Sequence, residues 1–363
     1  MRQPPGRRRV AAVLVGSALV GLLGACGGHP KRSAVRTVPP TTTVPVTTTT
    51  QPTTTTTVKR PVVCPLTGTP PPGGGRVPER PAVAVKVENL PAARPQWGLD
   101  SADIVFEEPV EGGITRFIAV YQCHTAARIE PVRSARFVDA DLLEPLGKIL
   151  FAYSGAIQPV VDLIGSSHLL EDVGYNRATK AYSPDPTRLA PHDLETSTSA
   201  LYAAGRALGY GREPPAPLFS FGPLPPGGKP VHVVRIDFPL GVTSWTWHPK
   251  AGHWYRYYSD TGPAIQGDNV QISAINVVIL HVHEYPTPYV EDETGAHENQ
   301  LVLTGSGPAW ILRNGVAIQG SWQRPALDRP ATFTGPHGVK ITLAPGNSWV
   351  ELVPWSDAVT ASS

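Results

Sequence analysis

Ten polar residues that could bind or transform a ligand gather between residues 89 and 136. They are Asn89, Arg94, Gln96, Glu107, Glu111, Thr115, Arg116, Arg133, Ser134 and Arg136. Arginine guanidinium groups hold a carboxylate, a phosphate or a sugar through paired hydrogen bonds. Two carboxylates can instead work as general acid and base, as they do in glycoside hydrolysis. The carboxylates that we consider for this second chemistry are Glu107 and Glu111.

The same residue types also suit a purely structural role. Several of them stand beside strongly apolar segments, and a charge that is buried there must be paired. The cluster is then an arginine–carboxylate network that fixes the surrounding loops. Glu107 and Glu111 would share one face of a continuous strand, but Pro109 and the turn that follows interrupt it. The sequence leaves ligand binding, catalysis and scaffolding open.

Two further groups could carry chemistry. Cys64 and Cys123 lie in a part of the chain that we place outside the membrane, where a leftover pair of cysteines suggests a disulfide. Two free structural thiols, or a thiol nucleophile formed by Cys123 beside His124, are the alternatives. His281 and His283 share one face of an expected strand and precede an acidic segment, so a metal site is conceivable. Exposed polar residues explain these histidines as well, and we predict no metal site.

Familiar catalytic signatures are missing from the sequence. It contains no H-E-x-x-H zinc helix and no P-loop. It also lacks the G-x-S-x-G elbow and the S-x-x-K acylation pair. No glycine-rich segment fits a dinucleotide site. We therefore predict no cofactor and favour binding over catalysis.

The elements that must position the cluster belong to a mixed first half, residues 61–215. Strands are expected at 82–88, 102–108 and 114–123, the last two forming a hairpin through a Glu-Gly-Gly turn. Helical patterns follow at 141–148, 158–164 and 197–208. This half is predicted to be an α/β domain.

The second half, residues 216–357, is predicted to be a mostly antiparallel β domain, because many short strands follow one another closely. Strands are expected at 231–237, 244–248, 253–259, 275–283, 300–304, 309–312, 316–322, 339–343 and 348–353. The fold class of the whole chain is α+β.

The first 25 residues read as a signal peptide. Arg7, Arg8 and Arg9 precede an apolar run that spans residues 10–23, which is too short to cross a membrane. The run ends in Leu-Gly-Ala-Cys, which resembles a bacterial lipobox with Cys26 as the lipidated residue. We therefore expect a lipid-anchored protein on the extracytoplasmic face of the cell membrane.

Residues 26–60 form the expected tether. The segment 37–57 holds 13 threonines in 21 positions, together with several prolines. Such a composition cannot bury enough apolar surface to fold. We predict a spacer and keep open whether it is glycosylated or carries a binding motif.

The N-terminal leader and tether differ in net charge from the rest of the chain. Residues 1–60 carry nine basic side chains and no acidic one, so the total of +2 leaves −7 on residues 61–363. A nucleic-acid binder needs a basic folded part, which argues against that class. The expected partners are the membrane, through the lipid, and a cell-wall glycan, a peptide or an envelope protein.

Several motifs carry a resemblance to a known family. They include Arg80-Pro-Ala-Val-Ala-Val, Ala93-Arg-Pro-Gln, Glu111-Gly-Gly-Ile-Thr-Arg-Phe and Pro131-Val-Arg-Ser-Ala-Arg in the first half, and Gly320-Ser-Trp in the second. Over about residues 80–357 the chain closely resembles the YerB-like family of bacterial lipoproteins, built of two domains of unknown function. The resemblance implies a surface lipoprotein but no established reaction. By this resemblance, a site is expected at the residues of the densest motifs, Glu107, Glu111, Arg116, Arg133 and Arg136.

The sequence therefore predicts a lipoprotein that binds a cell-envelope ligand. The alternative is a hydrolase that acts on wall polymers with Glu107 and Glu111.

Overall fold

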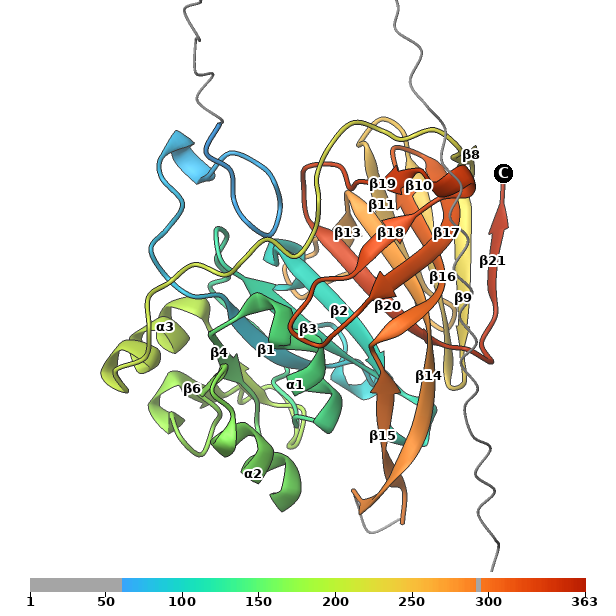
Figure 1. Ribbon diagram of the computed structural model, residues 1–363. Coiled ribbons are helices and arrows are strands. Elements are labelled where there is room, and N and C mark those ends of the chain that lie inside the picture. Colours follow the sequence, from blue (N-terminus) through green and yellow to red (C-terminus); the bar gives the residue numbers. More distant parts are fainter. Residues whose placement is uncertain (1–60, 292–294) are drawn as a thin grey trace, which may run out of the picture. The chain divides into compact units, whose positions relative to one another are not determined.

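The computed structural model describes residues 61–291 and 295–363 (Figure 1). The predicted signal peptide, the lipidated Cys26 and the tether lie outside these residues and stay predictions. None of the helices in the described part has the length and apolar character needed to span a membrane. The structure is α+β, with three short α-helices and extensive β-sheet.

A large mixed sheet runs through both halves of the sequence. Within the described residues its path is β19-β18-β17-β16-β14-β20-β2-β3-β1-β4-β5, with β15 added beside β14 and β8 beside β17. The bounds are β1 Val83–Glu88, β2 Ile104–Pro109, β3 Thr115–Tyr121, β4 Ile149–Ala152, β5 Leu170–Asp172, β8 Lys229–Pro230, β14 Asn276–Val290, β15 His297–Val302, β16 Gly305–Arg313, β17 Val316–Arg324, β18 Thr332–Thr334, β19 Lys340–Ile341 and β20 Ser348–Pro354.

Strand β20, near the end of the chain, joins the two halves. It pairs in parallel with β14 on one side and with β2 on the other. The sequence changes character near residue 215, but the sheet continues across that boundary. In the β2–β20 register Glu107 stands opposite Glu351, so two carboxyl groups from distant parts of the chain are neighbours.

A second, antiparallel sheet comes from the C-terminal half alone. Its path is β12-β11-β10-β9-β21, with β13 beside β11. The bounds are β9 Val233–Phe238, β10 Gly241–His248, β11 His253–Tyr258, β12 Gly262–Pro263, β13 Ser273–Ala274 and β21 Val359–Ser362; a separate hairpin pairs β6 Tyr182–Pro184 with β7 Leu194–Thr196.

The large sheet has an apolar core on each face. Along β2, Phe106 belongs to one core and its neighbour Val105 to the other, because successive side chains of a strand point to opposite faces. The first core includes side chains of α1 Phe137–Leu143 and α2 Gln158–Ser166. The second includes side chains of β9, β10 and β11 and of α3 Thr198–Ala207. Burial on both faces explains why β1, β2 and β3 have no exposed residue.

The helices are short, and residues at the ends of α3 determine where that helix begins and ends. Ser197 caps α3 by accepting a hydrogen bond from the Ala200 amide at 3.2 Å, and Gly209 follows the helix with a positive φ. The predicted helix at 141–148 is wrong in its bounds. Helix α1 starts and ends earlier, and a 3₁₀ turn follows it. Strand β4, for which no element was predicted, begins just after the predicted helix and pairs in parallel with β1.

Short 3₁₀ turns complete the described secondary structure. Their bounds are η1 Pro72–Gly74, η2 Pro91–Ala93, η3 Leu99–Ser101, η4 Glu111–Gly113, η5 Glu144–Leu146, η6 Thr179–Ala181 and η7 Pro336–Gly338. The predicted Glu-Gly-Gly turn is η4, which joins β2 to β3. Strand β14 is longer than predicted and, with β15, forms an arm that extends away from the rest of the sheet (Figure 1).

Candidate functional site

The structure divides the ten predicted site residues into two regions. Asn89, Arg94, Glu107 and Thr115 line a pocket, which we call the inter-sheet pocket. Gln96 supports it from behind, since its side-chain amide donates to Asn89 Oδ1 at 3.3 Å. The other predicted residues, Glu111, Arg116, Arg133, Ser134 and Arg136, belong to a closed set of ion pairs, the buried network.

The inter-sheet pocket lies between the ends of β1, β2 and β3 and the strands of the second sheet. Its cavity volume is about 100 Å³, which is smaller than the usual range for sites that hold drug-sized ligands. From the second sheet it receives Thr243 of β10, Tyr258 of β11 and, just after β11, Asp260. Neither half of the sequence builds this pocket alone.

Glu107 forms the floor of the pocket and is fully buried. Its Oε1 accepts hydrogen bonds from the Thr115 hydroxyl at 2.6 Å and the Asn89 amide at 3.2 Å. Its Oε2 lies 2.7 Å from an Nη atom of Arg256, which is also fully buried. The floor therefore carries a carboxylate whose charge is paired from behind.

Glu351 stands behind Glu107 and completes this floor. Arg256 Nη1 and the Trp245 indole nitrogen both donate to Glu351 Oε1, at 2.9 and 2.7 Å. Burial, and next the neighbouring charge of Glu107, raise the pKa of Glu351 well above its usual value. The raised pKa favours the protonated form of Glu351, which hydrogen-bonds to Glu107. With one proton on this pair of carboxyl groups, Glu107, Glu351 and Arg256 together have no net charge.

Arg94 and Asp260 form an ion pair at the mouth of the pocket. The Arg94 guanidinium contacts both oxygens of Asp260 at 3.1 Å and lies 3.5 Å from the ring centre of Tyr258. Leu240, which is 67% exposed, contributes apolar surface to the lining. The mouth is thus electrically neutral and partly apolar.

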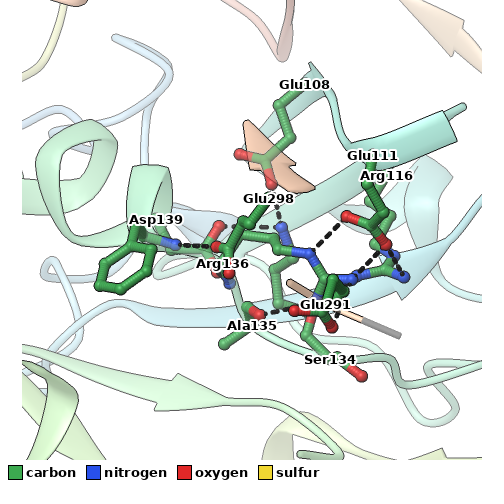
Figure 2. A network of polar contacts seen from close by, with 11 residues as sticks. Glu108, Glu111, Arg116, Ser134, Ala135, Arg136, Asp139, Glu291 and Glu298 are labelled. Carbon is green, nitrogen blue, oxygen red and sulfur yellow. Dashed lines mark hydrogen bonds and ion pairs between the residues drawn. The ribbon is translucent and has the colours of Figure 1, made fainter. Parts of the chain in front are cut away.

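The buried network is centred on Glu111 and two arginines (Figure 2). Arg136 Nε donates to Glu111 Oε2 at 2.8 Å, and Arg116 Nη2 donates to Glu111 Oε1 at 3.2 Å. Burial alone would raise the pKa of Glu111, but hydrogen bonds from Arg136 and the charges of both arginines lower it to about 2. Glu111 is therefore a fixed anion at neutral pH.

Arg136 also ties the β14–β15 arm to the network. One of its Nη atoms lies 2.8 Å from Glu291 at the end of β14. Nearby, Glu298 of β15 accepts a hydrogen bond from the Phe137 amide at 2.6 Å (Figure 2). Ser134 contributes only a backbone carbonyl to these contacts, accepting from Arg116 at 3.3 Å. The network therefore connects the β2–β3 turn, helix α1 and the arm.

Further ion pairs extend the network along β1 and β2. Lys86 contacts Glu108 and, at 2.8 Å, Asp139. Burial, with the charge of Asp139, raises the pKa of Glu108 to about 8. Arg133 lies 3.1 Å from Glu88. These residues pair with one another inside the protein, and none of them lines the inter-sheet pocket.

Comparison with known proteins places this architecture in a family. The model described as "Protein of unknown function (DUF3048) N-terminal domain" matches residues 66–211, and the corresponding C-terminal domain model matches residues 234–350. Over 302 residues the chain is 26% identical to the Bacillus subtilis (strain 168) protein named "Putative lipoprotein YerB", covering 79% of this chain and 85% of that protein. The chain belongs to the YerB-like family.

A solved structure agrees with this assignment at the level of the fold. The crystal structure of YerB protein from Bacillus subtilis matches with a TM-score of 0.70 and 24% identity, covering 82% of this chain and 99% of that one. In this YerB-like chain the inter-sheet pocket draws residues from both family domains. The family descriptions assign no function to either domain.

Sequence reasoning missed the half of the pocket that comes from the C-terminal domain. Arg256 and Glu351 carry the available signal, since each is a charged residue within an expected strand of mostly apolar or aromatic residues. A charge on the inward face of such a strand needs a buried partner. Nothing local in the sequence indicates that the partner is Glu107.

The cysteines and histidines considered from the sequence do not line the inter-sheet pocket. Cys64 and Cys123 are buried and joined in a disulfide, as predicted. Cys123 therefore has no free thiol to act as the nucleophile that the sequence left open. His283 stacks on Trp355 at 4.6 Å between ring centres. No group of three or more His, Cys, Asp or Glu placed to hold a metal occurs in residues 61–291 and 295–363. Asp292 and Glu293, which follow these histidines, lie outside the described residues.

Proposed function

We propose that this YerB-like chain is an extracytoplasmic lipoprotein, anchored through Cys26, that binds a cell-envelope ligand in the inter-sheet pocket. The lipobox-like leader and the threonine-rich tether support the location, and they agree with the name of the Bacillus relative. The tether allows the folded body to reach material beyond the membrane surface. The acidic body, at −7, disfavours nucleic acid as the ligand.

The observation that carries the binding proposal is the inter-sheet pocket itself. Four residues chosen from the sequence for their chemistry meet polar residues of the second family domain around one cavity. Pockets between structural units, with a few polar groups on a largely apolar lining, are the usual form of small-ligand sites. The polar groups here are mostly buried and held by hydrogen bonds, so they are preorganised.

The geometry disfavours the alternative of a hydrolase that uses Glu107 and Glu111. A general acid must hold a proton near the operating pH, and Glu111, with a pKa of about 2, does not. Glu111 belongs to the buried network, whereas Glu107 faces the pocket. The two carboxylates are thus not an acid–base pair around one cavity. We favour binding without turnover.

Anchoring is tested by replacing the expected lipidated residue. Cys26→Ala should move the protein from the membrane fraction to the soluble extracytoplasmic fraction and abolish labelling by a fatty-acid probe. Ser33→Ala, in the same segment, is the matched control and should change neither. Retention of label in Cys26→Ala would contradict the anchor.

Binding is tested by blocking the pocket in the full-length lipoprotein. Gly241 lines the pocket, and a Cβ added there meets no heavy atom within 4 Å. Gly241→Trp therefore has room for its first side-chain atom and places a bulky group at the pocket. It should weaken co-sedimentation with isolated wall sacculi about tenfold or more, the effect of losing about 1.4 kcal/mol of binding free energy.

Gly165→Trp provides the control, because Gly165 of α2 is exposed and a Cβ added there also meets no heavy atom within 4 Å. It should bind like the wild type, and both variants should keep the wild-type melting temperature. If the wild-type protein binds neither sacculi nor their soluble fragments, or if both variants bind equally, the proposed site is wrong.

A further inference from the structure

The charges of the inter-sheet pocket restrict the kind of ligand that it can hold. Glu107 is paired with Arg256 at 2.7 Å, and Arg94 is paired with Asp260 at 3.1 Å. A charged ligand would have to break one of these pairs or bring its own charge into the pocket without a partner. Both are costly in a partly buried site. An uncharged ligand avoids either penalty.

Part of the remaining hydrogen-bonding capacity lies on a hydroxyl group. The Tyr258 hydroxyl donates to Asn89 Oδ1 at 3.1 Å and is also hydrogen-bonded to Arg256. Thr243 Oγ1 accepts from Arg256 at 2.9 Å and keeps a proton to donate. Beside these groups lie the apolar side chains of Leu240 and Phe238. Hydroxyls on the edge of a ring and C–H groups on its faces match such a lining.

A second feature concerns the length of the ligand. Arg94 lines the pocket and also a neighbouring open groove of about 580 Å³, which Trp97 and Arg128 line too. The groove's cations are paired like those of the pocket: Arg128 lies 2.6 Å from Asp185 and 4.5 Å from the Trp97 ring centre. Both cavities therefore suit uncharged material, and they meet at Arg94.

We propose that the pocket takes one uncharged, hydroxyl-rich ring of a glycan chain and that the groove takes the rings that follow, with Arg94 at the junction. This inference rests on the proposed function and narrows it to a class of ligand. Of the envelope ligands considered from the sequence, it selects glycan over peptide and over anionic polymer.

The experiment measures how charge and length affect affinity for the full-length lipoprotein. Calorimetric titration uses N-acetylglucosamine oligomers of one to four rings, the de-acetylated amine forms of the same length, and uronic-acid oligomers. The neutral four-ring oligomer should bind about tenfold tighter than the single ring, and about tenfold tighter than either charged series. Gly241→Trp should remove this binding and Gly165→Trp should keep it.

A variant tests the charge argument directly. Asp260 is 46% exposed, so Asp260→Asn should fold, and it leaves the charge of Arg94 without its partner. The variant should bind uronic-acid oligomers several-fold better than wild type and neutral oligomers no better. Asp268→Asn, which changes an exposed aspartate outside the pocket lining, should bind as wild type does.

The outcomes separate the two proposals. If sacculi bind in a Gly241-dependent way but every oligosaccharide series fails, or a charged series binds best, the glycan inference is wrong and the binding function stands. If one and four neutral rings bind equally, the role of the groove is wrong. If neither sacculi nor oligomers bind, both proposals fail.

Discussion

The inter-sheet pocket and the buried network are built from the same residue types and lie only a few residues apart in the sequence. Glu107 and Glu111 illustrate the contrast. Both are buried and paired with arginine, but Glu107 borders a cavity, whereas Glu111 is enclosed by Arg116 and Arg136. Composition and spacing therefore do not distinguish a binding residue from a scaffolding residue here. The presence of a cavity does, and it depends on the second family domain.

The largest effect is expected from replacing Glu111, which lies at the centre of the buried network. Glu111→Gln should lower the free energy of unfolding by about 3 kcal/mol, because Arg116 and Arg136 lose the anion that they share in a buried place. Urea unfolding measures this. Ligand affinity of the folded fraction should not change.

Glu213→Gln, at an exposed position, is the control for that substitution and should be neutral. A loss of binding in folded Glu111→Gln, without a loss of stability, would reverse the roles assigned to the two regions.

The pocket floor itself offers a matched pair of substitutions. The raised pKa of Glu351 favours its protonated form, so Glu351→Gln replaces one neutral group by another and should lower stability by less than about 1 kcal/mol. Glu107→Gln removes the ion pair that Arg256 forms with Glu107, although the contact with Glu351 remains, and it should lower stability by about 2 kcal/mol or more. Chemical unfolding at neutral pH compares them. Equal effects would contradict the placement of the proton on Glu351.

The network should also set the pH dependence of stability. The pKa of Glu108 is raised to about 8 and that of Glu298 to about 7, in both cases chiefly by burial. Between the ordinary value of 4.5 and these values the folded protein binds more protons than the unfolded chain. Stability is thus greatest on the acidic side and declines as pH rises through 7 and 8.

We expect the free energy of unfolding to fall by about 2 kcal/mol between about pH 6 and pH 9. Urea unfolding across this range measures it. Glu108→Gln should flatten the profile, because that side chain no longer titrates. A rise in stability over the same range would contradict the assignment.

The smallest effect is expected from a single pocket hydroxyl. Tyr258→Phe removes the hydrogen bond to Asn89 and should lower the free energy of unfolding by about 1 kcal/mol. Ligand affinity should fall as well, which titration measures. Tyr175→Phe is the control, because Tyr175 is exposed and does not line the pocket; it should change neither stability nor ligand affinity. If Tyr258→Phe lowers stability but leaves ligand affinity unchanged, the pocket has a structural role and not a binding role.

Much of the local structure follows from the sequence because it depends on neighbouring residues. The hairpin of β2 and β3 follows from apolar alternation and a glycine turn. Asn314 and Gly315 both have positive φ in the turn between β16 and β17, as an Asn-Gly pair favours. Strand β4 was missed because its pairing with β1 depends on residues more than sixty positions away.

By itself the sequence determined the YerB-like family, the α+β class, most strands and the set of polar residues to examine. It also supplied the expectation of a leader and a tether. The tertiary structure decided which polar residues face a cavity and which are closed in ion pairs. It did so because parallel pairing of β20 with β2 brings Glu351 beside Glu107, and the second sheet then places Arg256 and Tyr258 over them. Contacts of this kind depend on residues hundreds of positions apart, and no local pattern records them.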